Sequence, residues 1–217
     1  MGPTRAVTTR AGTVRRRLAA AYPGTARELC ALRHDGPFQL LVATVLSAQC
    51  TDARVNLVTP ALFAELSGPA AMAGADQARL EELIRTTGFF RSKARNLVAL
   101  AQALVERFDG EVPDAMADLV SLPGVGRKTA NVVRSVAFGE PGLPVDTHVG
   151  RLSRRLGLTA HDDPVKVEED LDDLVPPGER GAFSLRLILH GRSVCTARSP
   201  RCGACVLGDV CPSVGIA

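Results

Sequence analysis

Residues 121–133 read SLPGVGRKTANVV, and this stretch decides how the chain is interpreted. Gly124 and Gly126 stand one residue apart, and the amphipathic pattern of a helix begins near the second of them. Glycine permits a tight turn with positive φ and leaves space for another molecule to approach the backbone. The N–H groups at the start of the following helix favour an anion such as a phosphate. A hairpin that joins two helices and binds nothing explains the same spacing equally well.

Helical periodicity of apolar residues extends from this stretch in both directions. The almost wholly apolar segment 38–48 predicts a buried helix at the centre of a domain. Thr51 and Asp52 predict the start of a helix that reaches about Leu66, with a kink or break at Pro60. No run alternates strictly between apolar and polar residues, so we expect an all-α fold. After a frayed N-terminus, further helices are expected over 14–21, 25–33, 76–86, 92–108, 114–120, 127–138, 147–157, 164–174 and 181–191, with Asp76 and Asp114 as N-caps.

The expected helices form two lobes. Gly139 to Pro144 is the stretch richest in Gly and Pro, and we expect the chain to pass from one lobe to the other there. The first expected domain is a helical bundle over 30–140 that contains the hairpin. The second comprises 141–217 together with the N-terminal residues 1–29.

Composition sets broad bounds on function. The 217 residues are 46% hydrophobic and 4% aromatic, which is enough apolar material for a core built from close-packed helices. The net charge of +3 is too small to indicate a nucleic-acid partner by itself. Arginines gather at 15–17, 151–155 and 192–201, where a phosphate-binding face and an ordinary solvated face are both compatible with the pattern. With no apolar run near the length of a membrane span and no secretory signal, we expect a monomeric cytoplasmic protein.

Six cysteines in such a chain favour metal or redox chemistry over disulfides. Cys30 and Cys50 stand alone in apolar segments, as small buried hydrophobic residues do. The other four form the pattern C-x6-C-x2-C-x5-C near the C-terminus: Cys195, Cys202, Cys205 and Cys211. Four thiolates so close together fit one metal centre, and the spacing alone leaves zinc and an iron-sulfur cubane both open.

Two charged residues follow the hairpin in positions suited to catalysis. Lys128 falls in the first turn of the helix after the hairpin, where the helix dipole tends to lower the pKa of an amine and make it a better nucleophile. Partial desolvation would act in the same direction. Asp146 begins VDTHVGRL, where an N-cap is the simplest interpretation. A cap and a catalytic carboxylate are compatible roles.

The conjunction of LPGVGRKTANVV, VDTHVGRLSRRLGL and the cysteine pattern resembles the endonuclease III family of helix-hairpin-helix DNA glycosylases. The resemblance extends from about Pro23 to Cys211 and keeps the order of the family's motifs. It implies a bifunctional glycosylase and abasic-site lyase that acts on damaged duplex DNA. It also implies that the four C-terminal cysteines hold one 4Fe-4S cluster.

By the same resemblance, Lys128 is the Schiff-base lysine and Asp146 the catalytic aspartate, acting on a nucleotide extruded into a cleft between the lobes. Gln49 matches the residue that fills the gap left by the extruded base. Phe89 stands where the family often has an aliphatic wedge, so its aromatic ring is a departure, and a place in the core explains it equally well. Further contacts to DNA are expected from Leu122, Gly124, Val125, Gly126, Arg127, His148, Arg198 and Arg201.

Oxidised pyrimidines are the substrate that the resemblance implies. The alternatives are a glycosylase with another lesion preference, such as pyrimidine dimers or mismatches, a glycosylase without strand cleavage, and an iron-sulfur protein that binds damaged DNA without chemistry.

Overall fold

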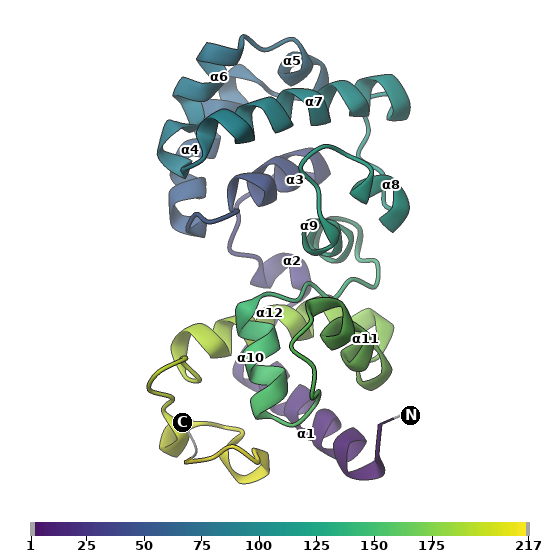
Figure 1. The fold of residues 1–217 in the computed structure, drawn as a ribbon, viewed down its shortest axis with the longest axis vertical. Coiled ribbons are helices and arrows are strands. Elements are labelled where there is room, and N and C mark those ends of the chain that lie inside the picture. Colours follow the sequence, from purple (N-terminus) through teal and green to yellow (C-terminus); the bar gives the residue numbers. More distant parts are fainter. Residues whose placement is uncertain (1–2, 216–217) are drawn as a thin grey trace. The chain divides into compact units, whose positions relative to one another are not determined.

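A computed structural model describes residues 3–215, and every regular element in that range is helical (Figure 1). The chain divides into two compact units. The central unit is Cys30–Phe138, and the terminal unit combines Met1–Leu29 with Gly139–Ala217. The all-α prediction is confirmed. No helix within residues 3–215 combines the length and apolar character needed to cross a membrane.

The central unit is built around a helix that is buried on every side. In α3 (Pro37–Leu46), all seven residues from Leu40 to Leu46 are buried, as the apolar sequence predicted. The long helix α7 (Phe90–Phe108) buries one stripe that includes Leu97, Leu100 and Leu104 at helical spacing. The other elements of this unit are α4 (Asp52–Glu65), α5 (Pro69–Ala73), α6 (Gln77–Ile84), the 3-10 turn η1 (Arg85–Thr87), α8 (Met116–Val120), α9 (Arg127–Val133) and the π-helical turn η2 (Arg134–Phe138).

The terminal unit packs the first helix of the chain against the last long one. Leu18, Leu152 and Phe183 are among the buried residues of its core. Figure 1 shows the C-terminal segment leaving the end of α12 as a loop with two short turns. The elements of this unit are α1 (Arg5–Ala21), α2 (Ala26–Leu29), α10 (Thr147–Arg155), α11 (Pro164–Leu174), η3 (Pro177–Glu179), α12 (Arg180–Ser193), η4 (Cys202–Ala204) and η5 (Gly208–Val210).

Two predictions near the N-terminus are wrong. The expected fraying and the helix start at 14 are replaced by a helix from Arg5, because Thr4 caps it and accepts a hydrogen bond from the Val7 N–H. The expected helix over 25–33 ends at Leu29. Beyond it, the Asn56 side chain hydrogen-bonds the Ala31 carbonyl at 2.8 Å and the Arg33 N–H at 2.9 Å, so the backbone there pairs outside a helix.

Four further details differ from expectation. Helix α4 continues through Pro60 without a break, and α5, which begins at Pro69, had no counterpart among the expected helices. The helix expected over 127–138 changes to π-helical geometry at Arg134, next to a Ser135 hydroxyl that donates to the Asn131 carbonyl. Asp114 is not an N-cap, since Ala115 holds that position.

The two expected caps give a paired test. Asp76 accepts a 2.8 Å hydrogen bond from the Arg79 N–H at the start of α6, whereas the Asp114 side chain is exposed and only its carbonyl is engaged, by Arg134. Asp76→Ala is expected to lower the free energy of unfolding by about 1 kcal/mol. Asp114→Ala is expected to lower it by much less. Urea denaturation followed by circular dichroism measures both, and equal losses would contradict the assignment of the cap.

Candidate functional site

The hairpin between α8 and α9 is a tight turn anchored by two buried side chains. Leu122 is 2% exposed and Val125 is 6% exposed, and the Val125 N–H donates to the Leu122 carbonyl at 3.1 Å. Gly124 has a φ of +77°, and a Cβ there would lie 3.1 Å from Asn96 Cβ. At Gly126, which is the N-cap of α9, a Cβ would meet no atom within 4 Å. The first glycine makes the turn, and the second leaves open space at the helix N-terminus.

Because Leu122 and Val125 are buried, their side chains are not available for contact with a bound molecule. Their side chains belong to the core of the central unit, so any contact that they make with a bound molecule goes through their backbone. Arg127 and Lys128, the first two residues of α9, are exposed. The hairpin therefore presents backbone and cationic groups at the N-terminus of α9.

Lys128 differs from the other two lysines in its position at the start of a helix next to the hairpin. The sequence contains three lysines: Lys93, Lys128 and Lys166. Lys93 is 5% exposed, and its amine donates to two backbone carbonyls. Lys166 lies on the exposed face of α11. Lys128 is exposed, so the structure does not show the partial desolvation that the sequence analysis considered for its amine.

Asp146 is the N-cap of α10. Its Oδ1 accepts hydrogen bonds from the His148 N–H at 2.8 Å and the Val149 N–H at 2.9 Å. The side chain is half-buried, in the terminal unit. The cap therefore fixes the position of the carboxylate through Oδ1, and it does not use Oδ2.

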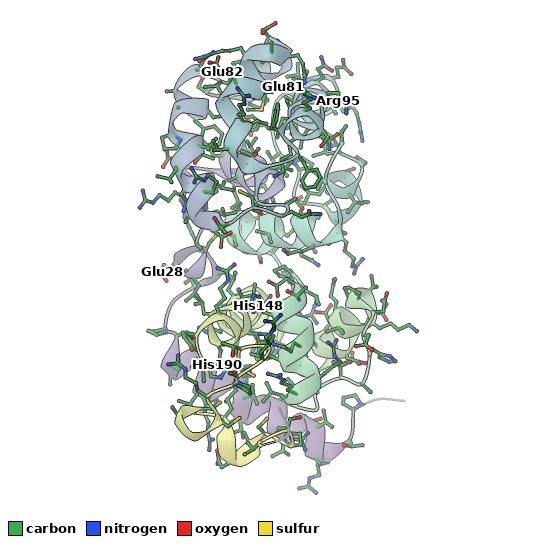
Figure 2. All side chains as sticks on the ribbon, turned by 60° about the vertical axis from the view of Figure 1, so that its left-hand side comes forward. Glu28, Glu81, Glu82, Arg95, His148 and His190 are labelled. Carbon is green, nitrogen blue, oxygen red and sulfur yellow. The ribbon has the colours of Figure 1, made fainter. Side chains whose placement is uncertain are left out.

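His148 faces α12 from the first turn of α10 (Figure 2). Its Nδ1 lies 3.1 Å from Arg151 Nη2, and a Cβ on Gly191 would meet the same ring atom at 3.0 Å. Burial lowers the pKa of His148, so the ring is neutral at pH 7. The ring also makes a hydrogen bond with the backbone of Gly191 on α12.

Gln49 and Phe89 share an unusual backbone conformation in the central unit. Their φ angles are +52° and +48°, and few residues other than glycine adopt such values. Both side chains are exposed, and Phe89 retains 66% of its accessible surface. The interpretation of Phe89 as a core residue is therefore wrong. A large exposed aromatic side chain held in a rare conformation is typical of a contact site.

The four C-terminal cysteines line one pocket in the terminal unit, together with Leu152, Leu207 and His190. Several donors point at their sulfur atoms. Arg155 Nη1 lies 3.4 Å from Cys195 Sγ, and the Leu207 N–H lies 3.4 Å from Cys205 Sγ. His190 Nε2 lies 3.3 Å from Cys205 Sγ, and this ring is labelled in Figure 2. No group of His, Cys, Asp or Glu in residues 3–215 is arranged to hold a single metal ion. Four cysteines around one pocket with hydrogen-bond donors to sulfur fit a cubane cluster.

Arg151 and Arg155, which belong to one of the arginine clusters in the sequence, hold the cysteine loop by hydrogen bonds to its backbone. Arg151 Nη2 donates to the carbonyls of Gly191 at 3.0 Å and Cys195 at 2.9 Å. Arg155 donates to the carbonyls of Thr196 and Ala197, both at 2.8 Å. The charge pattern alone did not distinguish this role from a solvated face. The spacing of four residues, which places both on one face of α10, was the available signal.

The other end of the loop is held by α1. Arg17 pairs with Asp209 and also donates to the Val206 carbonyl at 2.9 Å. Arg198 and Arg201 lie on the loop and are exposed, and Arg201 also donates to the Ser193 carbonyl. The loop is thus tied to the terminal unit on both sides of the cysteine pocket.

Comparisons with known proteins identify the class first. Residues 42–177 match the model of the HhH-GPD superfamily base excision DNA repair protein. Residues 195–211 match the iron-sulfur binding domain of endonuclease III. The hairpin and the cysteine loop thus belong to a base excision repair protein of the helix-hairpin-helix type that carries one 4Fe-4S cluster.

Comparison with individual proteins identifies the family within this superfamily. Endonuclease III of Synechocystis sp. is 55% identical over 193 residues, which cover 88% of this chain and 87% of the relative. A non-covalent endonuclease III–DNA complex matches with a TM-score of 0.88 at 43% identity, over 94% of this chain and 95% of that one. A trapped endonuclease III–DNA covalent intermediate gives the same TM-score at 44% identity and the same coverage. The chain belongs to the endonuclease III family.

The two glycines of the hairpin give a matched pair of variants. Gly124→Ala is expected to lower the free energy of unfolding by about 1–2 kcal/mol, because an alanine is strained at positive φ and its methyl group meets Asn96. Gly126→Ala is expected to cost less, since φ is −94° there and the space is open. Urea denaturation measures both variants. A larger loss for Gly126→Ala would show that the turn is built differently.

Proposed function

We propose that this chain removes oxidised pyrimidines from duplex DNA and then cleaves the strand at the resulting abasic site. As a member of the endonuclease III family, it is a base excision repair glycosylase and abasic-site lyase. The preference for oxidised pyrimidines rests on the family resemblance. We place its action in the cytoplasm, at the chromosomal DNA.

Lys128 is the proposed nucleophile, and its exposure at the N-terminus of α9 is the observation that carries this role. The damaged nucleotide leaves the base stack, because its sugar is inaccessible within the duplex. The neutral amine of Lys128 forms a bond to C1′ while the bond from C1′ to the base breaks, and the base leaves with a proton. The C1′–O4′ bond then breaks, O4′ takes the proton that Asp146 accepted from the amine, and the nitrogen and C1′ are left as a protonated imine.

Strand cleavage follows from the same imine. Its positive charge acidifies the C2′ protons, and removal of one of them breaks the C3′–O bond, so the 3′ phosphate departs. Water then hydrolyses the imine and releases the lysine. Asp146 is proposed to accept a proton from the amine and to stabilise the positive charge on the sugar.

The remaining contacts are proposed to hold the DNA. Backbone N–H groups at Gly124 and Gly126, with Arg127 beside them, suit a phosphate, and Gln49 and Phe89 are proposed to enter the base stack. On the terminal unit, His148 and the exposed Arg198 and Arg201 are proposed to contact further phosphates. Cys195, Cys202, Cys205 and Cys211 are the proposed cluster ligands. The bonded cluster gives a structural centre to a loop that is too short to form its own core.

Substitution of Lys128 tests the covalent step. An abasic duplex incubated with borohydride is expected to give a covalent adduct with the native protein, because borohydride reduces the imine to a stable amine. Lys128→Gln is expected to give none, whereas Lys166→Gln on the exposed face of α11 is expected to react normally. The adducts are counted on a denaturing gel. Undiminished trapping by Lys128→Gln would mean that another amine forms the bond.

Asp146 caps α10 and is also proposed to act in the reaction. The substitution Asp146→Asn distinguishes these two roles. Asparagine caps a helix about as well as aspartate, so Asp146→Asn is expected to leave the melting temperature nearly unchanged. Loss of the carboxylate is expected to slow base release by about 10²- to 10⁴-fold. Asp163→Asn is the control, since Asp163 caps α11 with the same two hydrogen bonds, to Val165 and Lys166. Equal base-release rates in both variants would rule out a chemical role for Asp146.

Visible absorption of the purified protein tests whether these cysteines hold an iron-sulfur cluster. Purified native protein is expected to be brown, and Cys202→Ser is expected to lose much of its visible absorption, because a ligand to iron is removed. Cys30→Ser is expected to keep the native spectrum, since Cys30 lies in the central unit with its thiol directed at the Leu32 carbonyl. Iron analysis accompanies the spectra. A colourless zinc-containing native protein would contradict the assignment.

A further inference from the structure

Lys93 is a buried cation that the proposed chemistry does not use. It lies in the first turn of α7 and is 5% exposed. Burial lowers the pKa of its amine. A buried amine is unfavourable unless hydrogen bonds compensate for the lost water. The arrangement of those hydrogen bonds shows what the residue does.

Both acceptors of Lys93 are carbonyls at the ends of helices. Its Nζ donates at 2.8 Å to the carbonyl of Leu46, the last residue of α3, and at 2.8 Å to that of Thr87, the last residue of η1. Carbonyls in the last turn of a helix have no partner inside the helix. A cation is also favoured there by the helix dipole. The Lys93 side chain thus caps the C-terminal carbonyls of two helical elements that are distant in the sequence.

A residue with positive φ follows each of these two helix ends within three positions. Leu46 precedes Gln49 by three residues, and Thr87 precedes Phe89 by two. Lys93 is also connected to Phe89 through its backbone, because its N–H donates to the Phe89 carbonyl at 3.0 Å. The two exposed side chains that are proposed to enter the base stack therefore stand on segments joined by one amine.

We propose that Lys93 is a positioning residue that holds Gln49 and Phe89 in a fixed mutual arrangement for insertion into duplex DNA. This inference rests on the insertion roles that we propose for those two residues. A pair of side chains fixed in advance loses less conformational freedom when it enters the stack. Lys93 itself is too deeply buried to touch DNA.

Lys93→Met removes the donors and keeps the length of the side chain. Abasic-site trapping is measured at single turnover on two substrates, a duplex and the same abasic strand alone. Insertion accompanies extrusion only in the duplex, since a single strand has no stack to replace. Trapping on the duplex is expected to slow by about 10- to 100-fold, as a small misplacement of positioning groups does. Trapping on the single strand is expected to stay within about twofold of native on the same reasoning.

Lys166→Met is the matched control and is expected to match the native protein on both substrates. If Lys93→Met does not fold, as judged by thermal melting, Lys93→Arg replaces it, because arginine keeps the donors but shifts the two segments. Equal losses on both substrates would show that Lys93 only stabilises the central unit, and this would overturn the proposal.

A double-mutant cycle with Phe89→Ala separates the proposal from the function on which it rests. Lys93→Met is expected to slow duplex trapping little further once the inserted ring is gone. If Phe89→Ala slows duplex trapping and the two losses are additive, Lys93 does not act through Phe89 and the inference fails alone. If Phe89→Ala and Gln49→Ala both leave duplex trapping unchanged, the insertion roles fail and the inference falls with them.

Discussion

The N-terminus of α9 is the feature that places the proposed nucleophile. The first N–H groups of a helix have no partner inside it, so they favour an anion. A turn anchored by the buried Leu122 and Val125 holds this end of α9 in place, and glycine adopts the positive φ at position 124 without strain or contact with Asn96. Lys128 follows in the first turn of the same helix. A single backbone arrangement thus positions both the groups that we propose to bind a phosphate and the amine that we propose as the nucleophile.

Groups that stabilise the fold also hold the residues that we propose for the chemistry. Asp146 caps α10, and the cap fixes the orientation of its carboxylate. Arg151 and Arg155 tie α10 to the cysteine loop, so the helix that carries Asp146 also supports the cluster. In the central unit, Lys93 closes two helix ends that precede exposed residues. The residues expected to meet DNA are therefore held by hydrogen bonds to regular elements.

Much of the fold followed from local patterns. The apolar run over 38–48 and the caps at Thr51 and Asp76 predicted α3, α4 and α6 because each depends on neighbouring residues alone. The early end of α2 was not predictable in this way, since it depends on Asn56, a residue distant in the sequence. The start of α1 was missed because its arginines hide a buried stripe formed by Ala11, Val14 and Leu18.

For the site, motif order indicated Lys128, Asp146 and the cysteines, but the burial of Lys93 has no local signal.

In the proposed mechanism Lys128 forms the bond to DNA, and mass spectrometry locates that bond. The borohydride-reduced adduct is digested with protease and nuclease, and mass spectrometry identifies the peptide that carries the sugar remnant. The modification is expected on Lys128. A remnant on Lys93, Lys166 or the N-terminal amine would contradict it.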